Sequence, residues 1–329
     1  MNTPHKGWKR WGCLVCCLAV LGIFTLADRP ASAKEFPARA IKVIVNTTPG
    51  GNSDLWARTW ADDFSKLLKV PVVISNQGGA SGMSALIEAA EAPADGYTIN
   101  TMTHSMVVGV SVNPNPPVDL FKDFTPIGGF GYFPSLIAVE QSSPFHTYEE
   151  LANYARQNPG KLKCGSAGAT MISHFTFEVL KQQAKLGIVM VPFKAAPEAV
   201  TALVGKHVDL ASLPPQSLLG FAKSGRVRFL LSTQKLKDYP QVPIFADKGL
   251  KEAGINAWLG LAVRSGVPKA AQKKLADAFA VVAKNQKIVS KIEAMNFTPD
   301  YLSAADFLAL LKRDHVNILK VAKQSKIGD

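Results

Sequence analysis

The sequence predicts an α/β protein of two lobes, each with a mostly parallel sheet and helices on both faces, and a cleft between the lobes. Strand-like and helix-like segments alternate along most of the chain, a pattern typical of parallel sheets covered by helices. No flexible linker divides the 329 residues into independent halves. We therefore expect the chain to cross between the lobes more than once.

Short apolar runs define the expected strands, and amphipathic stretches define the expected helices. The strands are Ile41–Asn46, Val70–Ser75, Tyr97–Thr101, Leu136–Glu140, Ile188–Val191, Val208–Ala211, Val227–Ser232 and Trp258–Val263. The helices between them are Ser53–Lys69, Gly82–Ala92, Tyr148–Gln157, Met171–Gln183, Pro197–Val204 and Leu218–Ser224. Helical patterns alone fill the C-terminal part, where we expect no further strand: Lys269–Lys284, Gln286–Met295 and Ser303–Lys323.

The expected crossings between the lobes lie near Val139–Ser142 and near Gly254–Trp258. Lobe 1 would then be discontinuous, comprising residues 34–139 and 257–329. Lobe 2 would comprise residues 140–256.

The first 33 residues have the pattern of a cleavable signal peptide. A basic start with Lys6, Lys9 and Arg10 precedes the apolar run Cys13–Ala27, and Ala31–Ala33 fits the small-x-small cleavage rule. The apolar run is shorter than the ~20 residues that a spanning helix needs, although an uncleaved membrane anchor is the alternative. The pattern predicts export to the periplasm.

Cysteine usage agrees with export and argues against a structural metal. Three of the four cysteines precede residue 33, so the mature chain keeps only Cys164 and can form no internal disulfide. The histidines show no ligand spacing, and we expect neither a metal site nor a cofactor.

The positive charge of the chain does not indicate a nucleic-acid partner. Cleavage after residue 33 would remove four basic residues and one acidic residue and lower the formal charge from +12 to +9. No run of Lys and Arg is interleaved with aromatic residues, as nucleic-acid binding would favour. A diffuse positive field would help to collect an anionic ligand.

Two glycine-containing loops, each between a strand-like run and a helical pattern, are the candidate binding elements. The segment Asn46–Asp54 follows the first strand, and Lys163–Thr170 precedes the helical stretch Met171–Gln183. The N-terminus of a helix presents free N–H groups and a positive dipole end, and it can bind an anion. Two such loops facing each other would grip a carboxylate from two sides. The first loop could instead be a simple turn between a strand and a helix.

Other patterns favour enzymes or nucleotide sites only weakly. The loop Ser75–Gly82 lacks the G-x-G-x-x-G spacing of a dinucleotide site. The cluster of Cys164, Ser166, Ser173 and His174 could suggest a hydrolase, but a nucleophile elbow needs G-x-S-x-G and this chain lacks it. We expect no enzyme activity, with a hydrolase using Cys164 or Ser166 as the alternative.

Two further candidates for ligand contact, Thr103 and His104, follow a strand end, where open α/β sheets bind ligands. A loop-structuring role for His104 is equally compatible with the sequence.

Six motifs occur in the order found in one family. They are Pro49-Gly50-Gly51-x-x-Asp54, Ala94-Asp95-Gly96-Tyr97-Thr98, Pro159–Leu162 with Gly165–Gly168, Ser173-His174, Val191–Lys194 and Val208–Leu210. The chain resembles the tripartite tricarboxylate transporter substrate-binding proteins, also called Bug or TctC-like receptors.

The resemblance implies a periplasmic binding protein of the type II class, whose lobes close on a ligand like a flytrap. It implies a small organic carboxylate as ligand, a membrane permease of two subunits as partner, and we expect a monomer. A sensor kinase in the membrane is the alternative partner. The resemblance carries two groups of ligand-binding residues onto this chain: Thr48, Pro49, Gly50, Gly51, Asn52, Ser53 and Asp54, and Ser166, Ala167, Gly168, Ala169, Thr170, Ser173 and His174.

The sequence departs from the family pattern at positions that bear on the ligand. An acidic residue often found four positions after Asp209 is Leu213 here, so an ammonium group would lack a partner. Together with Met102 and Trp258, Leu213 suggests a more apolar pocket, and we include Trp258 among the candidate ligand contacts. We therefore expect a mono- or dicarboxylate with an aromatic or aliphatic body. The segment Asn76–Gly82 also lacks the Arg that is common in the family.

Overall fold

The computed structural model describes residues 35–251 and 253–325. From Arg39 onward the chain forms one compact unit, and the fold and site described below lie in it. The expected signal peptide, residues 1–33, lies outside the described residues. Within them, no helix has both the length and the apolar character that crossing a bilayer requires.

The first of two sheets in the described chain has six strands in the order β11-β4-β10-β3-β1-β2. They are β1 (Ile41–Val45), β2 (Val72–Asn76), β3 (Thr98–Thr103), β4 (Phe124–Phe133), β10 (Ala257–Arg264) and β11 (Thr298–Leu302). Strand β1 pairs in parallel with β2 and β3. Strand β10 lies antiparallel between β3 and β4, and β11 is antiparallel to β4.

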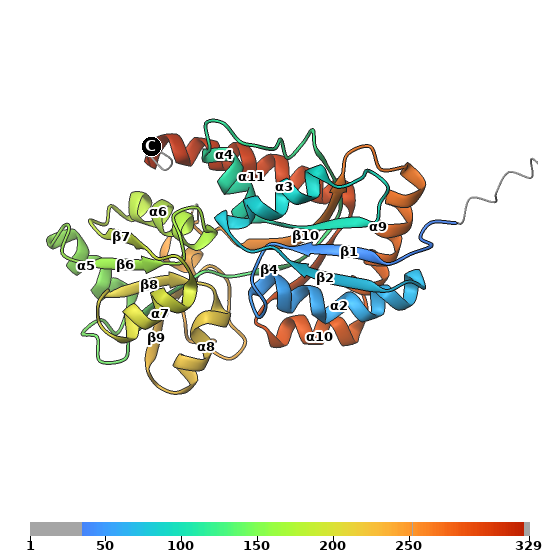
Figure 1. Ribbon diagram of the computed structural model, residues 1–329. Helices are drawn as coiled ribbons and strands as arrows, with labels where there is room; N and C mark the ends of the chain where they lie inside the picture. Colours follow the sequence, from blue (N-terminus) through green and yellow to red (C-terminus); the bar gives the residue numbers. More distant parts are fainter. Residues whose placement is uncertain (1–34, 252, 326–329) are drawn as a thin grey trace, which may run out of the picture. The chain divides into compact units, whose positions relative to one another are not determined.

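Helices cover both faces of this sheet (Figure 1). One group consists of α2 (Asn52–Leu68), α9 (Lys269–Ala283) and α10 (Gln286–Ala294). These three helices contact one another and the sheet. The other group consists of α3 (Met83–Glu91), α4 (His104–Val112) and α11 (Ala304–Ser325). The short turn η1 (Ala80–Gly82) precedes α3. Because β1 runs directly into α2 and β3 into α4, both helices begin at the same end of the sheet.

The second sheet has five strands in the order β7-β6-β8-β5-β9 within the described residues. They are β5 (Leu136–Glu140), β6 (Lys163–Ser166), β7 (Val189–Pro192), β8 (Leu210–Leu213) and β9 (Val227–Ser232). Strand β6 is parallel to β7 and β8, whereas β5 is antiparallel to β8 and β9. Its helices are α5 (Tyr148–Gln157), α6 (Ile172–Ala184), α7 (Ala196–Val204), α8 (Pro215–Lys223) and η2 (Phe245–Lys248).

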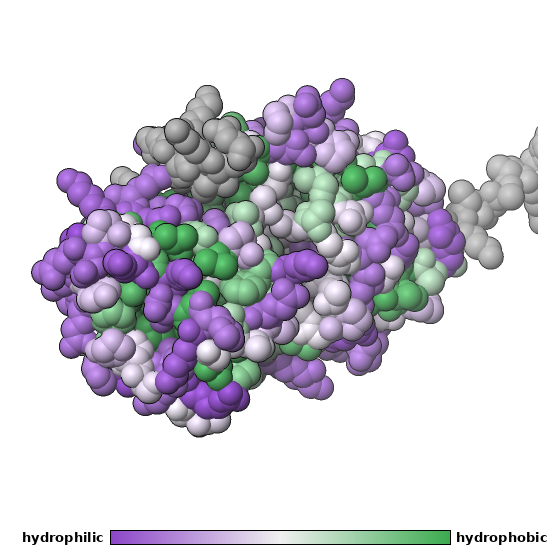
Figure 2. Space-filling view, turned by 60° about the vertical axis from the view of Figure 1, so that its left-hand side comes forward, coloured by the Kyte–Doolittle hydropathy of each residue, from purple (hydrophilic) through white to green (hydrophobic). Residues whose placement is uncertain are grey.

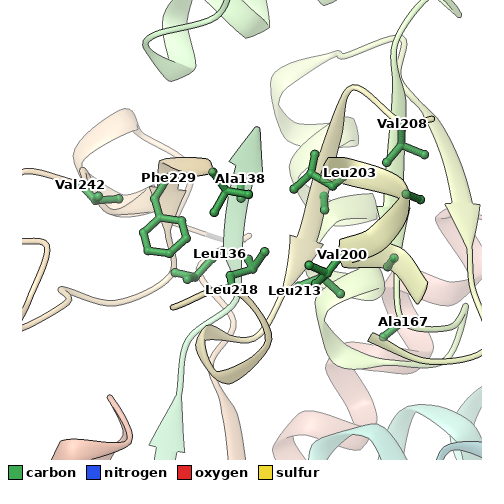
Figure 3. Close-up of a cluster of buried hydrophobic side chains, with 14 of the residues drawn as sticks. Leu136, Ala138, Ala167, Val200, Leu203, Val208, Leu213, Leu218, Phe229 and Val242 are labelled. Atoms are coloured by element: carbon green, nitrogen blue, oxygen red, sulfur yellow. The ribbon is translucent and has the colours of Figure 1, made fainter. Parts of the chain in front are cut away.

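Each sheet has its own apolar core. Between α2 and α9, the fully buried rings of Trp56, Trp60, Phe64 and Phe279 meet edge to face, with centroids 5.2–6.4 Å apart. In the second core, leucines of β5, β8, α7 and α8 pack together, as Figure 3 shows for Leu136, Leu203, Leu213 and Leu218. Burying one large apolar side chain stabilises a fold by roughly 1.5–3 kcal/mol, so these clusters hold the sheets that carry the two candidate loops.

The predicted α/β class with two sheets is confirmed, but the strand pairing is mixed rather than mostly parallel. Strand β10 enters the first sheet from the second sheet's part of the chain and lies antiparallel between β3 and β4.

The prediction that no strand follows Trp258–Val263 is wrong, because β11 forms at the edge of the first sheet. Its sequence contains Pro299 and Asp300, which disfavour strands, and proline is tolerated at a sheet edge. Strand β4 was missed because it contains Pro126 and three glycines, which also disfavour strands.

The chain changes sheets at residues 134–135, between β4 and β5, earlier than the crossing predicted near Val139–Ser142. It returns between η2 and β10, a segment that contains the start of the predicted crossing Gly254–Trp258. The exact division into lobes stays a prediction.

Candidate functional site

Asp54 organises the loop between β1 and α2. Its carboxylate accepts hydrogen bonds from the Gly50 amide at 2.8 Å, from Arg58 Nε at 2.9 Å and from Asn76 Nδ2 at 2.9 Å. Burial raises the pKa of Asp54, but these hydrogen bonds outweigh burial and leave the pKa below its ordinary value. Asp54 is therefore ionised near neutral pH, and its oxygens hold the loop in shape.

Two backbone amides in the first turn of α2 have no acceptor in the part of the chain that the structure describes. The Asp54 amide donates to Thr47 Oγ1 at 3.3 Å. The amides of Asn52 and Ser53 have no hydrogen-bond partner among residues 35–251 and 253–325, as expected at a helix start. Ser53 is buried, and a buried unpaired N–H costs free energy until it meets an acceptor.

The first turn of α6 repeats this arrangement on the second sheet. The Ile172 amide donates to Ser105 Oγ of α4 at 3.1 Å, so a hydroxyl from the first sheet's helices caps this helix. In the described part of the chain, the amides of Ser173 and His174 find no acceptor, although both residues are buried. Each of the two helices thus offers two free amides and a positive dipole end.

The turn at residues 78–82 contacts both loops. A Cβ added at Gly78 would lie 3.0 Å from the Thr48 amide nitrogen, which shows how closely this turn approaches the first loop. The hydroxyl of Ser81 forms a hydrogen bond with the hydroxyl of Thr170 in the second loop. The helices α4 and α6 are also in contact. The two candidate loops therefore belong to one region of the folded chain.

Three polar side chains, those of Ser166, His174 and Glu178, lie in a row behind the second loop. Ser166 Oγ lies 2.7 Å from His174 Nδ1, and His174 Nε2 lies 4.0 Å from Glu178 Oε1. Burial lowers the pKa of His174 more than Glu178 raises it, which keeps the imidazole neutral near pH 7. Although this order resembles a hydrolase triad, Ser166 is fully buried. Burial also raises the pKa of the Cys164 thiol well above its usual range, which opposes a nucleophilic role.

His104 and Trp258 form a separate buried cluster with Asp314. The two rings stack with their centroids 5.4 Å apart, and Trp258 Nε1 donates to Asp314 Oδ2 at 2.7 Å. His104 Nδ1 lies 3.3 Å from the carbonyl oxygen of Asn256. Burial lowers the pKa of His104, and Asp314 opposes this only in part. Here these rings fix α4 and α11 against β10.

Residues 56–324 match the family described as the tripartite tricarboxylate transporter family receptor, TctC. This match spans most of the chain. The chain belongs to this receptor family.

The TctC family assignment confirms the resemblance seen in the sequence, and individual proteins agree with it. Protein BugT of Bordetella pertussis is 30% identical over 258 residues, which cover 76% of this chain and 78% of BugT. The periplasmic binding protein BugD is 25% identical, with a TM-score of 0.79, over 89% of this chain and 99% of BugD. The R. palustris protein Rpa4515, solved with adipate, is 26% identical with a TM-score of 0.82 and the same coverage.

The TctC family consists of solute-binding receptors. In this member, the predicted site residues lie in the two loops, next to the first loop, and in the His104–Trp258 cluster. The residues of loops 48–54 and 166–174 lie at the two helix starts. Thr103 adjoins the first loop, since its Oγ1 accepts from Asn46 Nδ2 at 3.2 Å. His104 and Trp258 are only 2% exposed and pack mainly against each other and Asp314. Ligand contact by any of these residues stays a prediction.

Sequence reasoning missed Asn76, Ser81 and Ser105, which shape or join the loops. The only available signal for Ser105 was the start of α4. That helix is apolar all round, so its hydrophobic pattern has no helical period.

A cavity of about 630 Å³ lies away from these loops, where α5, the end of α6 and η2 meet. Two of its cationic residues already have partners: Arg156 donates to the Ala184 carbonyl, and Lys248 pairs with Glu149. Among the described residues, no group of three or more His, Cys, Asp or Glu side chains could hold a metal ion.

Proposed function

We propose that this TctC-family receptor captures a small organic carboxylate between the loop before α2 and the loop before α6. The supporting observation is a set of four backbone amides for which the described residues provide no acceptor, at Asn52, Ser53, Ser173 and His174. A carboxylate can accept several N–H bonds, and helix N-termini favour negative charge through both their donors and their dipole. A bound carboxylate would satisfy amides that the fold leaves unpaired.

The body of the ligand would lie against apolar surface. Met102 and Leu213 are fully buried near the ends of β3 and β8, and neither can pair with an ammonium group. Strand β3 pairs with β1, which leads into the first loop, and β8 pairs with β6, which leads into the second. The related R. palustris protein, solved with adipate, supports an aliphatic dicarboxylate as one member of the ligand class. We propose a mono- or dicarboxylate with an aliphatic or aromatic body.

The biological setting follows from the family. The receptor would act in the periplasm as a monomer, close its two predicted lobes around the ligand and deliver it to a membrane permease of two subunits. The family assignment supports a transporter as partner, and the periplasmic binding protein BugD supports the location.

Binding is tested by calorimetry of the chain from Lys34 onward against adipate, aromatic monocarboxylates, citrate and amino acids. A ligand at 100 times its Kd should raise the free energy of unfolding by about 2.7 kcal/mol, visible as a shift in Tm. Citrate or an amino acid binding more tightly than every aliphatic or aromatic mono- and dicarboxylate would contradict the proposed ligand class.

The two-amide site at α2 is tested by Asn52→Pro, with Asn52→Ala as the matched control. Proline is favoured at the first helical position, and Gly51 before it has φ −73° and ψ 166°, which proline accepts. We expect Asn52→Pro to keep the wild-type Tm without ligand and to lose about tenfold or more in affinity, since one charge-assisted hydrogen bond is worth roughly 1.5–3 kcal/mol. Equal affinity in both variants would refute a carboxylate at this helix start.

A further inference from the structure

The turn at residues 79–82 has a backbone that most residues avoid. Four consecutive residues have positive φ: Gly79 at 122°, Ala80 at 45°, Ser81 at 54° and Gly82 at 93°. Glycine adopts such angles freely, whereas a side chain with a Cβ makes the left-handed region unfavourable. Ala80 and Ser81 therefore occupy positions where glycine would be the less strained residue. Strain of this kind persists where the surrounding structure holds it in place, often at a functional site.

The strained backbone directs one polar group to the second sheet's part of the molecule. Ser81 belongs to η1, which follows β2 of the first sheet, and its hydroxyl bonds to Thr170, just before α6 of the second. Two residues further on, the Ile172 amide bonds to Ser105 of α4. Two hydroxyls from the first sheet's part of the chain thus meet the start of α6, next to the free amides of Ser173 and His174.

The surroundings fix the turn in this position. A Cβ at Gly82 would lie 2.8 Å from Met106 Cγ and 3.0 Å from Asn46 Nδ2, so the turn lies directly on β1 and α4. Thr170 is part-buried and precedes α6 by two residues. The hydrogen bond can form only while the two sheets' parts of the chain are close together, because each partner is fixed to its own side.

We infer that Ser81 and Thr170 form a clasp, a pair of positioning residues that holds the two sides together beside the ligand and slows its release. This inference rests on the proposed carboxylate function. The clasp contributes nothing to a conformation in which the two sides are apart, so its loss should raise the dissociation rate and leave the association rate nearly unchanged.

The experiment is a double-mutant cycle of Ser81→Ala and Thr170→Val. It has two readouts: urea unfolding of the ligand-free protein, and stopped-flow dissociation of the tightest carboxylate found by calorimetry. We expect each single variant to release ligand about fivefold faster, the loss expected for one net hydrogen bond. The double variant should release it no faster than either single variant, and unfolding should show the same non-additivity. Thr201→Val, which removes a hydroxyl bonded within α7, is the control and should change neither rate.

Ser81→Gly separates the hydroxyl from the backbone strain. This variant relieves the left-handed backbone at Ser81 and also removes the hydroxyl, so it should release ligand as fast as Ser81→Ala. Additive effects in both readouts, or a wild-type dissociation rate in Ser81→Gly, would overturn the clasp. Coupling in unfolding without binding of any carboxylate would refute the proposed function and its effect on release while keeping the contact. Binding without coupling would refute the clasp alone.

Discussion

At the scale of single residues, two buried histidines make stability depend on pH. Burial lowers the pKa of both His104 and His174 more than their acidic neighbours raise it. A histidine whose pKa is lower in the folded state binds more protons when unfolded. The free energy of unfolding therefore falls as pH drops below the unfolded value of about 6.5.

We expect the ligand-free protein to lose stability steadily between pH 7 and pH 5, and His174→Asn to lose less over that range. Asparagine keeps a polar group near Ser166 without the buried proton site. The measurement is the urea midpoint at several pH values. His146→Asn, at an exposed position, is the control and should follow the wild type. A wild-type pH slope in His174→Asn would contradict this explanation.

At the scale of elements, glycines let α11 lie directly on the first sheet. A Cβ at Gly129 of β4 would lie 2.9 Å from Phe307 Cδ2, and one at Gly260 of β10 would lie 2.3 Å from Phe307 Cζ. The ring of Phe307 occupies the space where side chains of both strands would be, and this contact positions α11 next to α4 and the capped start of α6.

Gly129→Ala should therefore destabilise the protein by about 1–3 kcal/mol, the usual cost of overpacking a core. Phe307→Leu in the same chain should recover part of the loss, because the smaller leucine side chain can move away from the new Cβ, whereas the rigid ring cannot. Gly220→Ala in α8, where a Cβ would meet nothing within 4 Å, is the control and should be neutral or slightly stabilising. Urea unfolding measures all three, and a neutral Gly129→Ala would be inconsistent with the contact.

Elements that are stabilised by local contacts could be predicted from the sequence, and strand β4, which contains Gly129, could not. Tyr148–Gln157 was predicted with the observed bounds, because Thr147 and Glu150 form a capping box that the local sequence encodes. Strand β4 could not be found from local patterns, because its Gly129 makes room for the ring of Phe307, a residue almost 180 positions away. Local patterns predict elements that are stabilised locally and fail where tertiary packing decides.

At the scale of the whole molecule, the two loops were predictable and their connection was not. A strand followed by glycines and a helical pattern indicates a helix start with free amides at both sites. Asp54 was expected in the first turn, but its bond to Asn76 depends on β2 lying beside β1. The hydroxyls of Ser81 and Ser105 find their partners, Thr170 and the Ile172 amide, only when the fold brings the start of α6 next to them.

Net charge also acts at this scale. The full chain carries a formal charge of +12, and on the face in Figure 2 polar residues surround small hydrophobic groups. A positive field attracts an anion over a distance that salt shortens, to about 10 Å at 0.1 M. We expect the association rate for a dicarboxylate to fall severalfold between 20 and 500 mM salt in stopped-flow experiments. A rate independent of salt would show that the field does not steer the ligand.

The contacts named between the two sheets' parts of the chain are all made by uncharged groups. Besides Ser81 with Thr170 and Ser105 with Ile172, Gln216 donates to the Met295 carbonyl at 3.0 Å, and Thr298 donates to Gln234 at 3.0 Å. Neutral contacts are hardly screened by salt. Arrival and residence of the ligand would therefore be controlled separately, so that a cell in a saltier medium would fill its receptors more slowly and yet keep each captured molecule for about as long.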